Sequence, residues 1–390
     1  MESIFDEILP KEGLGYIKWG LSSEPDAIGM GVADMDFKTA PAVTEALVRT
    51  AASGMFSYHF KPDTYYESIV DWYHRTYNLP LNREWILNTP GTWAAFELCL
   101  QSFTQKGDGV IIQTPRFEPI LNEVEYAGCQ IITNPMILRD GKYELDFEDF
   151  ENKIRTYHPA VYFMVNPHNP TGRVFTKEEL TRLGRICLDN HVLMISDEVH
   201  SIITYDGHPH TPAFGVCEEM AQNCIVLLSP SKGYNLMDLT YCLIMIPNDK
   251  LRKKYEQSMR GYNFNFATNI FSVSAVQAAF SRASDPWVKD VTAYLADNLM
   301  YLKQFFSAKL PGIRVIIPEG SYFVWLDFRE YNLTPDELRK RIEHQARVVL
   351  TWGETFGPDG EGFERLNFAC PRATLDTALD RLYQVFKQEE

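Results

Sequence analysis

The stretch that decides the fold is VYFMVNPHNP, residues 161–170, in which an apolar run ends abruptly in a polar turn. Similar runs before polar turns occur at Trp85–Leu87, Val110–Ile112, Val192–Ser196 and Ile225–Leu228. Segments of helical period separate them, one of which opens with a capping box at residues 176–179. This alternation predicts an α/β fold with a mostly parallel sheet sandwiched between helices.

The same pattern suggests how the chain divides. We expect residues 51–270 to form a large domain that contains this sheet, and residues 271–390 to form a smaller α+β domain. The first segment, residues 1–50, is expected to pack with the smaller domain. The smaller domain is indicated by a strand pattern at Tyr322–Phe328 and by an apolar stripe in the last helix, made by Leu375, Ala378, Leu379, Leu382 and Phe386.

Composition excludes several classes of protein. The 390 residues are 45% hydrophobic and 23% charged, as is typical of soluble globular proteins. The net charge of −15 disfavours nucleic acid and anionic membranes as partners. No apolar run approaches the roughly 20 residues of a membrane span, and the acidic N-terminus does not resemble a signal peptide. Seven cysteines without a CxxC pair favour a cytoplasmic protein with no metal site.

Polar residues follow the predicted strands and are expected to meet. In open α/β sheets, ligands bind beyond the carboxyl ends of the strands. Residues Gly91-Thr92, Asn169, Asp197 and the turn Ser229-Pro230-Ser231-Lys232 come directly after such runs. The topology therefore predicts that they converge on one crevice.

These residue types suit one kind of cofactor. A lysine in a dry pocket loses its charge readily and forms Schiff bases, which is the role expected for Lys232. Asp197 is expected to pair with a cation deeper in the site. Ser229, Ser231 and the backbone N–H groups of Gly91-Thr92-Trp93, at the start of a predicted helix, are suited to a phosphate. A nucleophilic amine, a buried carboxylate and a phosphate cradle together describe a site for pyridoxal 5′-phosphate (PLP).

At this point the chain resembles a known family along nearly its whole length. The matching segments, in order, are IKW (17–19), ADMDF (33–37), NPHNPTG (166–172), SDEVH (196–200), SPSK (229–232), GSY (320–322) and RLNFACPR (365–372). They resemble the fold-type I PLP enzymes of the class I/II aminotransferase superfamily. ADMDF and SDEVH favour the cystathionine β-lyase-like, cystalysin-type C–S lyases. The resemblance implies an aspartate-aminotransferase-like fold.

The resemblance also implies roles around the cofactor. Lys232 would bond the cofactor aldehyde and later move protons, and Asp197 would keep the pyridine nitrogen protonated. Asn169 would donate to the ring 3′-oxygen, near which His200 would lie. Phe117 would stack on the ring, although the branch usually has Tyr at this position.

The phosphate and the substrate are assigned in the same way. Gly91, Thr92, Trp93, Ser229 and Ser231 would hold the phosphate. Tyr58 would reach the phosphate from a partner subunit, which implies a homodimer. Arg372 would clamp the α-carboxylate of the substrate, and Ala33, Asp34 and Asn169 would complete the substrate site.

The implied activity is a carbon–sulfur β-lyase. It would cleave L-cystathionine or a related L-cysteine S-conjugate to a thiol, pyruvate and ammonia by α,β-elimination. One alternative is a class I/II aminotransferase that passes an amino group to a 2-oxo acid. Another is a PLP-binding regulatory protein with little turnover. The sequence does not identify the thiol, the pathway or an oligomer beyond a dimer.

Overall fold

The computed structural model describes residues 3–10, 15–24, 26–262, 264 and 269–387. Its main sheet has seven strands in the order β2-β10-β9-β8-β7-β3-β4. The strands are β2 (Ile86–Thr89), β3 (Gly109–Thr114), β4 (Gln130–Pro135), β7 (Val161–Val165), β8 (Leu193–Asp197), β9 (Cys224–Leu228) and β10 (Cys242–Met245). Only β10 runs against its neighbours β9 and β2. The predicted mostly parallel sheet is therefore confirmed.

Helices cover both faces of this sheet, and the residues of β7 show how. Val161 and Phe163 pack in a cluster with side chains of α4 (Thr92–Phe103), α5 (Pro119–Tyr126) and α10 (Asp249–Gly261). Tyr162 and Met164 pack on the other side, with side chains of α6 (Phe147–Tyr157), α7 (Lys177–Asp189) and α8 (Glu218–Ala221). Because both of its faces are buried, a central strand such as β7 is an unbroken apolar run.

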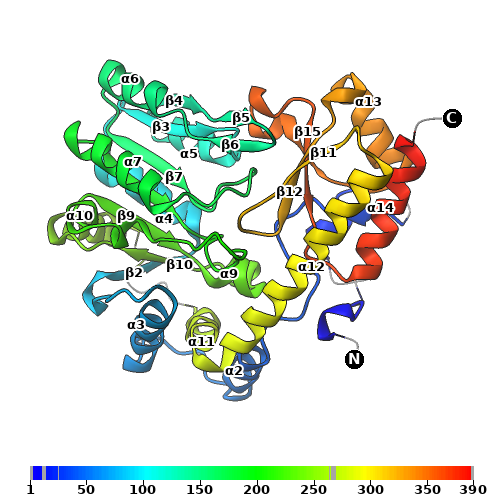
Figure 1. Cartoon of the computed structure of the whole chain (residues 1–390). Coiled ribbons are helices and arrows are strands. Elements are labelled where there is room, and N and C mark those ends of the chain that lie inside the picture. The colour runs from blue at the N-terminus through cyan, green and yellow to red at the C-terminus, as the bar shows by residue number, and fades with distance from the viewer. Residues whose placement is uncertain (1–2, 11–14, 25, 263, 265–268, 388–390) are drawn as a thin grey trace.

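A second, antiparallel sheet stands beside the first in the order β11-β12-β15-β14. Its strands are β11 (Arg314–Ile316), β12 (Phe323–Asp327), β14 (Thr351–Trp352) and β15 (Phe363–Asn367). Helices α12 (Asp285–Lys309) and α14 (Arg372–Phe386) lie next to this sheet, and α12 reaches from it to α2 (Pro41–Ala52) and α11 (Ile270–Ala279) (Figure 1). Helix α13 (Pro335–Arg339) leads into a π-helix at Lys340–Gln345.

The N-terminal part of the chain contacts elements next to both sheets. After α1 (Ile17–Gly20), strand β1 (Ile28–Gly29) pairs in parallel with β13 (Val348–Val349), close to the second sheet. Helix α2 instead packs on α11, which in turn contacts α3 (Asp63–Tyr77) and α9 (Pro230–Tyr234). The proposed domain limits at residues 50 and 270 remain a prediction.

The remaining elements are short. A hairpin is made by β5 (Ile137–Arg139) and β6 (Lys142–Glu144). The 3₁₀ helices are Ile4–Asp6, Arg83–Trp85, Ala213–Gly215, Met237–Leu239, Arg282–Ser284, Arg329–Tyr331, Gly353–Phe356 and Pro358–Gly360. Among the described residues, no helix is both long and apolar enough to cross a membrane.

Candidate active site

A pocket of about 630 Å³ lies at the carboxyl ends of the main-sheet strands. Of the residues singled out in the sequence, it is lined by Ala33, Thr92, Trp93, Phe117, Asn169, Asp197, His200 and Lys232. The other walls come from Leu21, from residues 349–352 and Thr355 near the second sheet, and from Glu343 and Arg365. The strand ends therefore do meet in one crevice, and the second sheet closes its other side.

Lys232 lies on the short helix α9, whose start is capped by the Ser229 side chain. Its Nζ atom donates a hydrogen bond of 2.9 Å to the carbonyl oxygen of Ala33. Burial lowers the pKa of Lys232 to about 8, and Arg365 adds to the effect, while Asp34 and Asp197 oppose it. The amine is thus far more easily deprotonated than a surface lysine, as a nucleophile and proton carrier must be.

Asp197 ends strand β8 and is buried. Burial raises the pKa of its carboxyl group to about 7, although the backbone N–H of Val199, at 3.1 Å from Oδ1, and the Lys232 ammonium favour the charged form. A carboxylate in this state gains stability from a cationic partner in the pocket. A protonated pyridine nitrogen is such a partner.

Asn169 and His200 occupy the wall between these two groups and the second sheet. The Oδ1 atom of Asn169 accepts a hydrogen bond from Arg365 at 2.8 Å, which leaves the amide N–H₂ as a donor toward the pocket. His200 Nδ1 lies 3.0 Å from the Ser321 hydroxyl. Burial, with smaller effects of Lys232 and Arg365, lowers the pKa of His200 well below its usual range, so the ring is neutral.

Only some of the groups predicted to bind the phosphate are free to do so. Gly91 precedes α4 with φ of +100°, and no side chain caps this helix, so the backbone N–H groups at Thr92 and Trp93 are available to an anion. The Ser229 hydroxyl donates to the carbonyl oxygen of Tyr241 at 2.6 Å and accepts from the Ser231 N–H. Ser229 therefore serves as a helix cap in this arrangement, and of the two serines Ser231 has the uncommitted hydroxyl.

The ring-stacking position is held by aromatic contacts. Phe117 lines the pocket, with its ring 6.0 Å from that of Trp93 and 6.2 Å from that of Phe356. The interplanar angle of 29° to Trp93 makes these rings nearly parallel. Phe117 thus presents a fixed apolar face to any planar group in the pocket.

Arg372, which the resemblance assigned to the substrate carboxylate, lies outside the pocket lining. Arg372 begins α14, where its Nε atom donates to Asn298 at 2.8 Å and its guanidinium lies 4.4 Å from the Tyr301 ring centre. It joins α14 to α12 and does not line the pocket. Of the residues in the RLNFACPR motif, the resemblance assigned this role only to Arg372 and gave none to Arg365.

Arg365 on β15 is the arginine that lines the pocket. It is 3% exposed, and its Nη2 atom donates to the Gly31 carbonyl oxygen at 2.9 Å and to the Thr351 hydroxyl at 3.1 Å. No carboxylate within the described part of the chain forms an ion pair with it. A buried guanidinium without a counter-charge is suited to bind a carboxylate. The sequence offered no local signal for this role, because β15 has the sequence FERLN and carries Glu364 and Asn367 beside Arg365.

Besides Arg372, five predicted residues lie outside the pocket lining, namely Gly91, Ser229, Ser231, Asp34 and Tyr58. Asp34 forms an ion pair with Lys18 at 3.3 Å. The Tyr58 side chain is 97% exposed and borders a different hollow with Phe56, Pro90 and Tyr241, next to the turn that precedes α4. The described residues contain no group of three or more His, Cys, Asp or Glu side chains placed to hold a metal ion.

The residues present fit PLP. The pocket offers a readily neutralised amine at Lys232, a buried acid at Asp197, an amide donor at Asn169 and an aromatic face at Phe117. The uncapped start of α4 suits the phosphate.

Comparisons with known proteins agree with this geometry. Residues 25–382 match the family described as "Aminotransferase class I and II". The chain is 35% identical to "Cystathionine beta-lyase PatB" of Bacillus subtilis (strain 168), over 97% of this chain and 98% of that protein.

Solved structures show the same architecture. A PLP-bound putative aminotransferase from Clostridium difficile 630 is 33% identical and superposes with a TM-score of 0.95 over 98% of this chain and 99% of that one. Cystalysin from Treponema denticola, whose structure contains a pyridoxal 5′-phosphate cofactor, is 28% identical, with a TM-score of 0.94 over 99% of each chain.

Proposed function

Because the chain belongs to the class I and II aminotransferase family, we propose that it is a PLP-dependent carbon–sulfur β-lyase. Its substrate is L-cystathionine or a related S-conjugate of L-cysteine, and its products are a thiol, pyruvate and ammonia. The observation that carries this proposal is that one pocket is lined by Lys232, whose pKa is lowered, by the buried carboxyl group of Asp197 and by the guanidinium of Arg365.

The chain's residues divide the work of holding the cofactor. PLP supplies an aldehyde that bonds amines and a ring that withdraws electrons from the bond being broken. Lys232 Nζ bonds the aldehyde, and the Asp197 carboxylate holds a proton on the pyridine nitrogen. Asn169 donates to the 3′-oxygen, Phe117 covers the ring, and the N–H groups at the start of α4 bind the phosphate.

The substrate is oriented from the second sheet. Arg365 binds the α-carboxylate through charge-assisted hydrogen bonds, with Ala33 and Asn169 beside it. Once its amine is free, Lys232 removes the α-proton, a step for which a positioned base contributes about 10²–10⁴-fold. The same amine would then carry this proton to the departing thiolate.

We propose a homodimer in which Tyr58 completes the phosphate site of the partner subunit. Met55, Phe56, Tyr58 and Phe60 expose large apolar side chains within six residues of chain, and such patches are typical of interfaces. A cytoplasmic location is supported by the seven cysteines, which form no disulfide and of which six are buried.

The test is a lyase assay with a small panel of cysteine conjugates. Purified protein supplied with PLP and L-cystathionine is expected to form pyruvate and a free thiol with no amino acceptor present. Strict dependence on a 2-oxo acid would contradict the lyase.

The aminotransferase remains the second candidate because a relative of 33% identity is described as a putative aminotransferase. It uses the same residues up to removal of the α-proton. Amino-group transfer to a 2-oxo acid without thiol release would identify it. Bound PLP with no turnover of any amino acid would instead indicate a regulatory protein.

A further inference from the structure

Residues 31–37 cross the pocket wall without regular secondary structure, and side chains hold their backbone. Asn367 Nδ2 donates to the carbonyl oxygens of Val32 and Asp34 at 2.7 and 2.6 Å. Asn235 bonds both the N–H and the carbonyl oxygen of Met35, at 2.9 and 2.8 Å. We call residues 31–37 the strap. Its polar groups are satisfied by distant parts of the chain, so its position depends on those side chains.

The strap carries the acceptor of the Lys232 amine. The Ala33 carbonyl oxygen accepts from Lys232 Nζ at 2.9 Å and from the Tyr322 hydroxyl at 3.1 Å. At Gly31 an added Cβ would lie 2.9 Å from the backbone of Leu350, so the strap rests directly on that segment. A small movement of the strap therefore moves the atom that orients the reactive amine.

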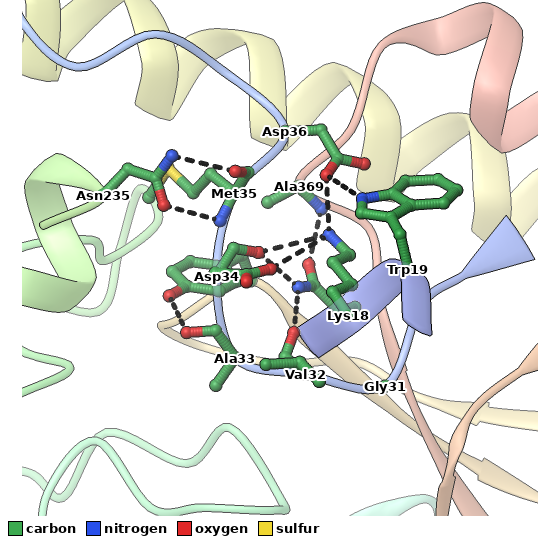
Figure 2. Close-up of polar contacts among 12 residues, drawn as sticks. Lys18, Trp19, Gly31, Val32, Ala33, Asp34, Met35, Asp36, Asn235 and Ala369 are labelled. Atoms are coloured by element: carbon green, nitrogen blue, oxygen red, sulfur yellow. Dashed lines mark hydrogen bonds and ion pairs between the residues drawn. The ribbon is translucent and has the colours of Figure 1, made fainter. Parts of the chain in front are cut away.

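Behind the strap lies an ion cluster of Lys18, Asp34 and Asp36, in which Lys18 and Asp36 are buried and Asp34 is partly exposed (Figure 2). Lys18 is 2% exposed, and its Nζ atom lies 3.3 Å from Asp34 Oδ1 and 3.2 Å from Asp36 Oδ1. Trp19 Nε1 also donates to Asp36 Oδ1 at 3.2 Å. Both carboxylates belong to the strap, and they flank Met35, so one ammonium fixes two of its points.

From this geometry we propose that Lys18 is a positioning residue for Lys232. Its ammonium, bound to Asp34 and Asp36, holds the strap so that the Ala33 carbonyl oxygen fixes the direction of the Lys232 amine. The inference rests on the proposed function, in which Lys232 bonds the cofactor aldehyde. It adds a residue that touches neither the cofactor nor the substrate.

The energetics of the cluster favour this role. Burial by itself lowers the pKa of Lys18, but Asp36 and Asp34 more than offset it, so the net pKa is raised and the ammonium stays charged. Removing one partner from a buried ion cluster leaves charge without compensation, which is strongly destabilising locally. Without Lys18 the Asp34 and Asp36 carboxylates repel each other, and the strap between them is expected to shift.

The test follows how fast cofactor-free protein captures PLP, read from the absorbance of the covalent product. Lys18→Met is expected to slow capture about tenfold, the effect of losing one well-placed hydrogen bond. Affinity for pyridoxine 5′-phosphate, which has the ring and phosphate but no aldehyde, is expected to change by less than about twofold. If Lys18 had only a structural role, Lys18→Met would lower both the rate of PLP capture and the affinity for pyridoxine 5′-phosphate.

Two further variants make the result decisive. Lys38→Met removes a lysine that pairs with Glu7 at the exposed end of the same segment, and it is expected to capture PLP at the wild-type rate. Asp36→Asn removes one strap anchor while keeping the side-chain volume, and it is expected to slow capture in the same selective way. If thermal unfolding shows that Lys18→Met does not fold, the capture rate of Asp36→Asn tests the positioning role in its place.

The outcomes separate the two proposals. Unchanged capture in both Lys18→Met and Asp36→Asn, or an equal loss for both ligands, overturns the positioning role while the proposed function stands. A wild-type protein that does not capture PLP overturns the proposed function, and the positioning role with it.

Discussion

Arg365 Nη1 donates a hydrogen bond of 2.8 Å to Asn169 Oδ1, and this bond joins the second sheet to the main sheet inside the pocket. Asn169 follows β7, whereas Arg365 lies on β15, almost two hundred residues later in the chain. The contact links the group assigned to the cofactor with the group assigned to the substrate.

Replacing Arg365 with lysine is expected to weaken substrate binding. Arg365→Lys keeps the charge but loses the planar, two-pronged donor, so kcat/KM should fall by about 10- to 100-fold, mainly through KM. Steady-state kinetics with L-cystathionine measure this. Arg372→Lys is the matched control, expected to change kcat/KM by less than about threefold. The reverse order of effects would restore Arg372 as the carboxylate clamp.

Removing the amine of Lys232 is expected to abolish covalent capture and turnover. Lys232→Ala should show no absorbance of the bond to PLP, because Lys232 is the lysine that lines the pocket within the described residues. Far-ultraviolet circular dichroism and thermal unfolding are expected to show an intact fold. A variant that still bonds PLP covalently would mean that another lysine is the anchor.

Neutralising Asp197 is expected to leave PLP bound and to slow turnover. Asp197→Asn keeps the side-chain volume but removes the charge that holds a proton on the pyridine nitrogen. We expect kcat to fall by about 10²-fold or more, the scale on which fixed charges stabilise developing ones. Exchange of the substrate α-proton with solvent deuterium, followed by NMR, should slow in parallel. Unchanged exchange would contradict the role given to this carboxylate.

The pH dependence of PLP capture should report the lowered pKa of Lys232. Only the unprotonated amine attacks an aldehyde, so the capture rate should rise about tenfold per pH unit below pH 8 and level off above it. A lysine with an ordinary pKa would give a rate still rising near pH 10. Stopped-flow absorbance measurements between pH 6 and 10 distinguish the two profiles. A profile that does not level off below pH 10 is the contrary result.

The proposed contribution of Tyr58 to a partner subunit can be tested by mixing inactive variants. Tyr58→Ala and Lys232→Ala each damage both sites of their own homodimers. In a mixed dimer one site receives both changes and the other receives neither, so random mixing should restore about a quarter of wild-type activity. Recovery is measured after unfolding and refolding the variants together. No recovery, in dimers shown to have mixed, would place Tyr58 in its own subunit's site.

Much of this protein follows from local sequence pattern. The apolar runs before residues 166, 197 and 229 predict strands whose ends meet, because parallel strands covered on both faces are apolar throughout and end in polar turns. The expected capping box at Thr176 is present. The Glu179 N–H donates to the Thr176 hydroxyl, and the Thr176 N–H donates to the Glu179 carboxylate. Periodicity and turn chemistry act over a few residues, so they can be read from the chain.

The choice of Arg365 over Arg372 and the burial of Lys18 were decided only by tertiary structure. The two arginines lie seven positions apart, and each is plausible until β15 pairs with β12 and β14 and directs Arg365 toward Asn169. Nothing in the local sequence distinguishes Lys18 from a surface lysine. Its ion pairs with Asp34 and Asp36 form only because the N-terminal segment folds back against residues 34–36. Contacts between distant segments depend on how sheets and loops pack, and local pattern carries no information about that packing.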